Sequence, residues 1–262
     1  MSNFEYKKSL GQNFLQDQNI VNKIASSITP SKEDLIIEIG PGAGALTKEL
    51  VKKECDVICF EIDKRLENTL KRLESDNNNL KIIFDDFLKV NIKDYINTKK
   101  YNNLYFIGNL PYYITTAIIN KIIKECTPYE IVIMVQKEVA DRFNANPGSR
   151  EYGSLSVFLQ YNFEIEKICD VNKKCFEPIP KVDSTVIKFK TTLKYKEKVK
   201  NEDKFYRIIK DSFTHKRKNL RNNLMNYNLS KIEEILKKHN KDLTSRAESL
   251  TIEEFIDISN SI

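Results

Sequence analysis

The 262-residue sequence has no apolar run long enough to cross a membrane. Its longest apolar run lies near Ile131–Val135, whereas a membrane-spanning helix needs about 20 apolar residues. The first residues, Met1–Glu5, also lack an apolar signal segment. We therefore expect a protein that stays in the cytoplasm where it is made and has no membrane partner.

Cysteine pairs with the spacing of zinc sites are missing as well. The sequence has five cysteines, an odd number that does not suggest a disulfide framework: Cys55, Cys59, Cys126, Cys169 and Cys175. Cys55 and Cys59 flank a predicted strand, which favours thiols in a hydrophobic core over a metal site. The sequence therefore predicts no bound metal and fits a reducing compartment.

The chain does contain enough apolar residues for a substantial core. Hydrophobic residues make up 40% of it, including 14 Phe and 12 Tyr, so disorder along the whole chain is excluded. A chain of this length can form one large domain, or a large and a small one.

Short β-rich runs alternate with helical patterns through the first 190 residues, which is typical of a parallel sheet with crossover helices. We predict helices over Leu46–Lys53, Arg65–Glu74 and Ser154–Tyr161 and the start of another over Lys137–Asn144. The predicted strands are seven, with an antiparallel final pair: Leu35–Ile39, Asp56–Phe60, Leu80–Phe84, Leu104–Gly108, Glu130–Val135, Glu164–Val171 and Ser184–Lys190.

After residue 192 the β pattern stops and a small helical domain is predicted. Lys194–Asn201 reads as a charged linker, and Thr251 with Glu254 resembles a capping box that opens a final helix. The predicted domains are therefore residues 1–192 and 193–262. The helices expected before the capping box cover Asp203–Phe213, Lys216–Asn226 and Ser230–Lys238.

Positive charge is concentrated in this last segment. The segment from Lys194 to Ile262 contains 16 Lys and Arg and 11 Asp and Glu, so its net charge is +5, whereas the net charge of the whole chain is +6. Four cations fall within six residues at Lys216, Arg217, Lys218 and Arg221. Such crowding indicates a polyanionic partner whose phosphates neutralise it, although a solvated helix face also explains many charged runs.

The tetrapeptide Asn109-Leu110-Pro111-Tyr112 follows an apolar run and suits methylation of an exocyclic amine. The amide oxygen of Asn109 and a nearby backbone carbonyl can accept the two amine hydrogens. The ring of Tyr112 offers a face on which a base can stack. The alternative is a turn that ends a strand, because Asn and Pro are common turn residues.

The segments after the first predicted strands favour a nucleoside-containing cofactor. Gly40 and Gly42 lie in a glycine-rich turn between a strand and a helix, where backbone can approach a ligand closely. Glu61 ends the second strand and can bind ribose hydroxyls; Asp86 ends the third and can receive an adenine amino group. A dinucleotide site is the competing interpretation, but Pro41 inside the turn favours S-adenosylmethionine.

Taken together, these motifs resemble the rRNA adenine dimethyltransferase family from Ser9 to about Leu224. The resemblance implies a seven-stranded, Rossmann-like, S-adenosylmethionine-dependent methyltransferase sheet with a small C-terminal helical domain. It is carried by motifs that occur in the family's order: Gly11–Leu15, Glu38–Gly42, Glu61–Asp63, Asp86, Asn109–Tyr112, Phe176–Ser184 and Arg217–Leu224.

The resemblance also implies roles for single residues. The catalytic group would be Asn109, Leu110, Pro111 and Tyr112, with Phe176 as a second aromatic wall for the base. The cofactor would be bound by Asn13, Leu15, Gly40, Gly42, Glu61, Asp86 and Asn109. RNA would be contacted by Lys181, Lys216, Arg217, Lys218 and Arg221.

Within the family, two branches compete. Leu110, where Erm resistance enzymes usually have Ile, and the Pro178–Ser184 run favour the branch that dimethylates two adjacent adenosines near the 3′ end of 16S rRNA. The expected partner is thus 16S rRNA in the small ribosomal subunit or its precursor, bound by a monomer. Tyr113 departs from the Asn of many relatives. The alternatives are an Erm-type enzyme acting on 23S rRNA, a DNA adenine methyltransferase and a non-catalytic ribosome-assembly factor.

Overall fold

A computed structural model describes residues 13–97, 100–110 and 114–262, which form two compact units. The first unit holds the described residues up to 137 together with residues 166–191, and the second holds residues 138–165 and 192–262. The contacts thus divide the chain at 137/138, 165/166 and 191/192. They also place residues 138–165 with the C-terminal helices, because these residues pack against those helices.

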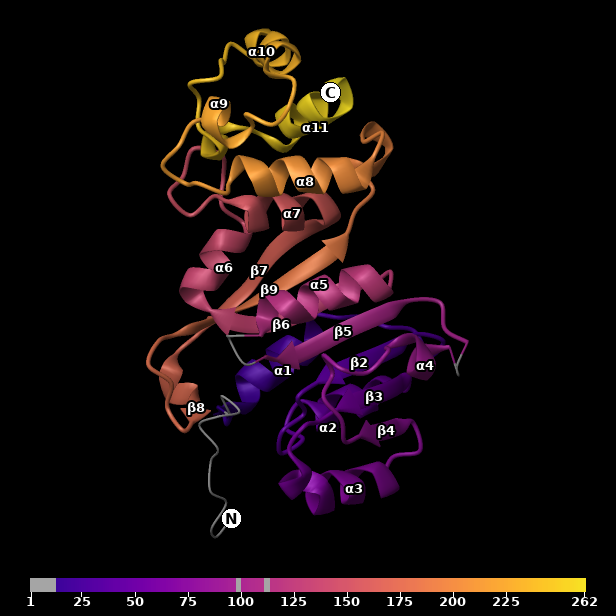
Figure 1. Ribbon diagram of the computed structural model, residues 1–262. Coiled ribbons are helices and arrows are strands. Elements are labelled where there is room, and N and C mark those ends of the chain that lie inside the picture. The colour runs from indigo at the N-terminus through magenta and orange to yellow at the C-terminus, as the bar shows by residue number, and fades with distance from the viewer. Residues whose placement is uncertain (1–12, 98–99, 111–113) are drawn as a thin grey trace. The chain divides into compact units, whose positions relative to one another are not determined.

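All seven predicted strands are present in one sheet, in the order β4-β3-β2-β5-β6-β9-β7 (Figure 1). Strands β2 to β6 pair in parallel, whereas β9 runs antiparallel to β6 and separates it from β7. The strand bounds are β2 Leu35–Ile39, β3 Asp56–Phe60, β4 Leu80–Ile83, β5 Leu104–Asn109, β6 Glu130–Gln136, β7 Phe163–Val171 and β9 Ser184–Thr191. The predicted fold class is confirmed.

The central strands are buried along most of their length, as expected for parallel strands covered on both faces. All five residues of β2 are buried. In the register of the sheet, Ile39 at the end of β2 lies beside Phe60 at the end of β3. Gly108 in β5 passes so close to β2 that an added Cβ would lie 2.4 Å from the Ile39 carbonyl oxygen. The carboxyl ends of β2, β3 and β5 therefore meet at one edge of the sheet, where ligands bind in such folds.

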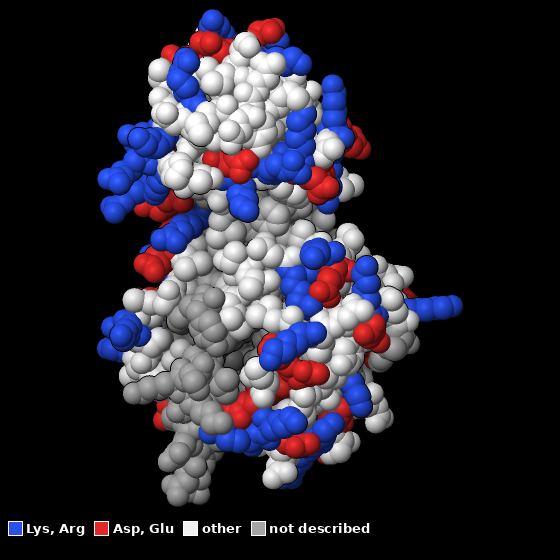
Figure 2. Space-filling model, in the orientation of Figure 1, with Lys and Arg blue, Asp and Glu red and all other residues white. Residues whose placement is uncertain are grey.

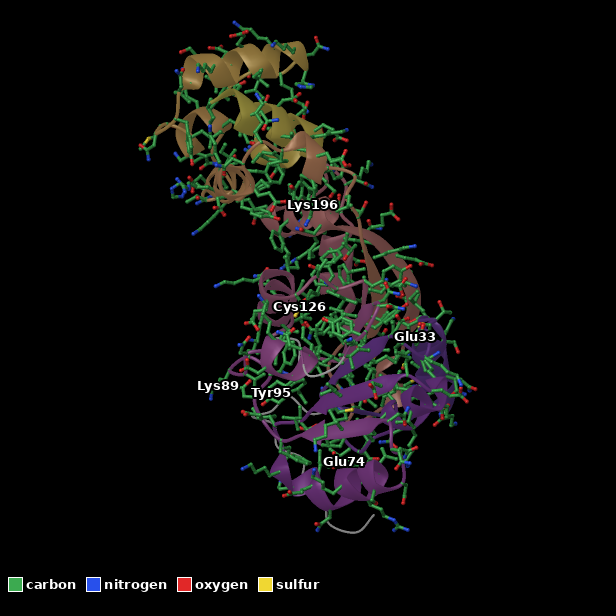
Figure 3. The ribbon with its side chains drawn as sticks, turned by 90° about the vertical axis from the view of Figure 1, so that its right-hand side faces the viewer. Glu33, Glu74, Lys89, Tyr95, Cys126 and Lys196 are labelled. Atoms are coloured by element: carbon green, nitrogen blue, oxygen red, sulfur yellow. The ribbon has the colours of Figure 1, made fainter. Side chains whose placement is uncertain are left out.

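Helices connect the strands of the first unit, and a half-buried side chain fixes α3 to the sheet. Glu74 of α3, labelled in Figure 3, accepts a hydrogen bond from the Ile82 amide of β4 over 2.9 Å and another from Lys71 over 2.6 Å. The helix bounds are α1 Gln18–Ser26, α2 Thr47–Leu50, α3 Glu67–Ser75, α4 Lys93–Ile96 and α5 Thr115–Glu125, and short 3-10 turns extend α2 to Lys53 and precede α3.

A small second sheet joins the N-terminal arm to a late part of the chain. Strand β1 (Phe14–Leu15) pairs antiparallel with β8 (Phe176–Glu177), with Leu15 opposite Phe176. The Gln16 amide extends this pairing by donating to the Cys175 carbonyl over 2.8 Å. Two segments separated by about 160 positions thereby lie side by side.

The second unit is helical and has its own core of aromatic and aliphatic residues. Its helices are α6 Lys137–Phe143, which starts at the boundary, α7 Ser154–Asn162, α8 Glu202–Ser212, α9 Leu220–Asn223, α10 Leu229–Lys238 and α11 Ile252–Ser261. Tyr161 of α7 packs against Phe205 of α8 with tilted rings whose centroids are 4.6 Å apart, and it donates to Glu202 over 2.7 Å. The predicted capping box is confirmed. The Thr251 hydroxyl accepts a hydrogen bond from the Glu254 amide, and the Glu254 carboxylate accepts one from the Thr251 amide.

One predicted helix of the second unit is wrong for most of its length. Of Lys216–Asn226, only Leu220–Asn223 is helical. Asn219 caps that turn by accepting from the Asn222 amide, so the cations at 216–218 lie before the helix in a loop. No helix in the described ranges is long and apolar enough to span a membrane.

Candidate cofactor and base-binding site

The turn after β2 is built around three glycines with left-handed backbone. Gly40, Gly42 and Gly44 have φ angles of +71°, +58° and +81°, a conformation that other residues adopt only with strain. A Cβ on Gly42 would also lie 2.8 Å from the ring of Phe14 in the N-terminal arm. The turn therefore requires glycine at this position for two independent reasons.

Glu61 holds this glycine turn from the end of β3. One oxygen of its carboxylate accepts from the Gly42 amide over 3.0 Å, and the other accepts from the Asp63 amide over 2.8 Å. Only 5% of the residue is exposed, and this burial raises the pKa of the carboxyl. The predicted ribose ligand thus lies beside the glycine turn.

Glu38 carries a buried carboxyl for which no separate role was predicted; the sequence motif Glu38–Gly42 only includes it. It lies in β2 and is 1% exposed. The Thr47 hydroxyl donates to it over 2.7 Å and the Cys59 thiol over 3.3 Å. Burial raises the pKa of Glu38 to about 7 in spite of these hydrogen bonds, and the nearby charge of Glu61 adds to the rise. A Glu inside the otherwise apolar run Leu35–Ile39 was the available signal.

Asp86 follows β4 in a tight turn. Its carboxylate accepts from the Leu88 amide over 3.0 Å and lies 3.5 Å from the ammonium of Lys89. Beside the turn, Phe60 meets Phe87 and Tyr95 edge to face, with ring centroids 5.3 and 5.1 Å apart. Figure 3 shows Lys89 and Tyr95 on the same side of the sheet. The aromatic packing fixes the turn that presents Asp86.

Asn109, the last residue of β5, is tied to the N-terminal arm. Its side-chain nitrogen donates to the backbone carbonyl of Asn13 over 2.9 Å. A Cβ on Gly40 would lie 3.9 Å from the Asn109 carbonyl oxygen, so the glycine turn and Asn109 are neighbours. Leu110 is buried, whereas Pro111, Tyr112 and the divergent Tyr113 lie outside the described residues.

Two further predicted site residues lie in the small sheet. Leu15 is half-buried, and Phe176 opposite it is 2% exposed within the hydrophobic cluster of the first unit. The structure therefore brings the arm next to Phe176. The ring packs here as a core side chain, and its role as a wall for the target base stays a prediction.

The predicted RNA-binding cations are all exposed but belong to different units. Lys181 lies in the first unit, and Lys216, Arg217, Lys218 and Arg221 lie in the second. The ammonium of Lys216 donates to the Arg150 carbonyl over 3.1 Å. Figure 2 shows Lys and Arg side chains gathered on the second unit at the height of the loop before α9.

The residues present fit S-adenosylmethionine. The space beside the Gly40 backbone is open. A Cβ added to Gly40 would have no atom closer than the Asn109 carbonyl oxygen at 3.9 Å, so a ligand has room to approach the backbone of the glycine turn there. Glu61, which directly follows β3, and Asp86, in the turn after β4, carry carboxylates, which can accept hydrogen bonds from ribose hydroxyls and an adenine amine. No group of three or more His, Cys, Asp or Glu side chains suited to a metal ion occurs among the residues that the structure describes.

Comparisons with known proteins agree on one family. Residues 3–262 match the family model described as ribosomal RNA adenine dimethylase. The chain is 45% identical to "Ribosomal RNA small subunit methyltransferase A" of Clostridioides difficile, over 99% of this chain and 92% of that protein. The protein of the same name from Bacillus pumilus is 44% identical over 98% and 91% of the two chains.

Two solved structures share the fold over nearly the whole chain. A dimethyladenosine transferase from Plasmodium falciparum superposes with a TM-score of 0.77 at 25% identity, covering 94% of this chain and 95% of that one. The 23S rRNA methyltransferase ErmE superposes with a TM-score of 0.76 at 24% identity, covering 95% and 99%. The latter likeness shows the fold alone.

Proposed function

The chain belongs to the ribosomal RNA adenine dimethylase family, and on that premise we propose that it dimethylates adenosine in 16S rRNA. The substrates are S-adenosylmethionine and two adjacent adenosines near the 3′ end of the small-subunit RNA. The relatives at 40–45% identity are all named small-subunit methyltransferases, which supports this target over the 23S rRNA named for ErmE.

One observation carries the proposed chemistry: the hydrogen bond from Asn109 to Asn13. A backbone carbonyl can only accept, so this bond commits the NH₂ group of the Asn109 amide to Asn13. The amide oxygen is then the atom left to accept a hydrogen from an exocyclic amine. Holding the amine in this way withdraws its lone pair from ring conjugation and aims it at the methyl donor.

The chain's own residues act by positioning. When bound, the cofactor supplies an electrophilic methyl carbon for in-line displacement. Asn109 holds the amine, and no side chain is required as a strong base, because the nitrogen becomes far more acidic once the new bond forms. Hydrogen bonds that strengthen as this charge develops provide the remaining stabilisation. In the second transfer, an amine with one methyl group offers one hydrogen bond fewer.

The target base must leave its stack to reach Asn109, because an exocyclic amine inside a helix is not accessible to this edge of the sheet. Exposed cations at Arg217, Lys218 and Arg221 offer contacts to RNA phosphates, and Lys181 adds one in the first unit. Phosphate contacts of this type position folded RNA by its shape rather than by its sequence.

The test is to incubate the protein with labelled S-adenosylmethionine and, separately, small subunits, large subunits and duplex DNA, and then to map the methylated bases. We expect label in two adjacent adenosines near the 3′ end of 16S rRNA, and none with Asn109→Ala. Label only in 23S rRNA or only in DNA contradicts the proposed substrate. Failure of the protein to bind the cofactor contradicts the enzymatic role and favours an assembly factor.

A further inference from the structure

Glu38 closes the glycine turn at its base. Glu38 lies in β2, two positions before Gly40, and Thr47 is the first residue of α2. Their 2.7 Å hydrogen bond, between two buried side chains, therefore joins the two ends of the segment that forms the turn. The thiol of Cys59, which lies beside Glu38 in the register of β2 and β3, donates to the same carboxylate oxygen.

The surroundings of Glu38 leave its charge without a cationic partner in the described residues. From β3 it faces the Cys59 thiol, and beyond β3 the carboxylate of Glu61. From α2 it faces the neutral hydroxyl of Thr47, and from β5 its register partner is apolar Ile107. Because desolvation and a neighbouring carboxylate both disfavour its charged form, Glu38 is poised to ionise when a cation arrives.

S-adenosylmethionine brings such a cation, because its sulfonium carries a fixed positive charge that its thioether product lacks. We propose that Glu38 is a positioning residue for the cofactor turn and that it loses its proton when the sulfonium cofactor binds. The inference rests on the proposed use of S-adenosylmethionine. Glu38 acts through Thr47 and the glycine turn, and its charge favours the cationic cofactor over the neutral product.

Calorimetry in two buffers of different ionisation enthalpy measures the protons released on binding. At pH 6.5 the folded protein holds most of a proton on Glu38, since its pKa is about 7. We expect the wild-type protein to release roughly half a proton or more with S-adenosylmethionine and clearly less with S-adenosylhomocysteine. In Glu38→Gln, whose amide still accepts from Thr47, this difference between the two ligands disappears.

We also expect the preference for cofactor over product to fall about tenfold in Glu38→Gln. Thr47→Val keeps the ionisable group and opens the turn, so it should weaken both ligands and retain the proton release. Glu130→Gln is the matched control: it is a buried glutamate of the same sheet, at the start of β6 and paired with Lys188 over 2.9 Å, and should change neither quantity.

Different results contradict the role of Glu38 and the proposed function of the protein. Proton release by Glu38→Gln equal to that of the wild type, with an unchanged preference between the ligands, overturns the role of Glu38. Absence of cofactor binding by the wild-type protein instead contradicts the proposed function itself. If Glu38→Gln does not fold, equal proton release for the two ligands in the wild-type protein also overturns the inference.

Discussion

The side chain of Asn109 donates to the backbone carbonyl of Asn13, and this 2.9 Å bond joins residues 96 positions apart. It connects the end of β5 to the arm that carries Phe14, whose ring closes over Gly42. Phe14, Gly42 and Asn109 therefore lie close together, and substitutions at the glycine turn and at Asn109 should have separable effects.

Removal of the Asn109 amide should stop methyl transfer while leaving cofactor binding largely intact. In Asn109→Ala the target amine loses the acceptor that orients it, and loss of one such positioned group lowers rates by about 10²–10³-fold. Single-turnover transfer of labelled methyl groups to small subunits measures the rate, and calorimetry measures cofactor affinity. Near-normal turnover would remove Asn109 from the reaction.

Gly42→Ala should abolish cofactor binding because the new Cβ strains the backbone and collides with Phe14 at 2.8 Å. Gly148→Ala is a matched control. Gly148 also has positive φ, +86°, but nothing lies within 4 Å of its added Cβ. The control should lose about 1 kcal/mol of stability and bind the cofactor normally. Equal cofactor affinities of the two variants would show that the contact with Phe14 is unimportant.

Stability should depend on pH through Glu38. Burial raises its pKa from 4.5 to about 7, so between these values the folded protein holds a proton that the unfolded chain has released. The free energy of unfolding therefore receives its full contribution below pH 4.5 and loses roughly 3 kcal/mol of it as the pH rises through 7. Urea titrations at pH 5 and pH 8 measure this change.

Glu38→Gln should lack this part of the pH dependence, so its stability relative to wild type should improve between pH 5 and pH 8. Burial raises the pKa of Glu61 in both proteins, and the difference between their stability curves therefore reports Glu38 together with its repulsion by Glu61. Parallel stability curves for the two proteins would mean that Glu38 ionises normally in the folded state.

Charge reversal at Arg217, Lys218 and Arg221 should weaken RNA binding and reduce its salt dependence. Each lost phosphate contact lowers the slope of log K against log salt concentration by about one. Reversal of Lys231, Lys237 and Lys238 on α10 changes the charge of the same unit equally at other exposed positions. If both triple variants show the same slope, the loop before α9 and Arg221 in α9 have no special role in RNA binding.

The sequence was most informative where local pattern decides structure. The strands were found because apolar runs such as Leu104–Ile107, and the run Leu35–Ile39 with its single Glu38, are bounded by turn residues, and burial on both faces leaves little alternative. The long helix predicted over Lys216–Asn226 failed because Asn219 caps a single turn. Local charge and periodicity did not reveal that the preceding cations form a loop.

Contacts between distant segments could not be read from the sequence. The pairing of Leu15 with Phe176 and the hydrogen bond between Asn13 and Asn109 depend on the tertiary fold, which brings distant parts of the chain together. The burial of Glu38 was indicated by its apolar strand, but its hydrogen bonds to Thr47 and Cys59 depend on the register of β2 and β3. The sequence thus indicated candidate site residues but not the contacts between them.

The place of β9 between β6 and β7 has a consequence for how the protein is made. During synthesis β6 is complete at Gln136, but the strand that covers its edge begins only at Ser184. At about 5–20 residues per second, the ribosome leaves this edge uncovered for several seconds. An uncovered apolar strand edge pairs readily with other chains, so nascent chains that stall before Ser184 should be the species most prone to aggregate.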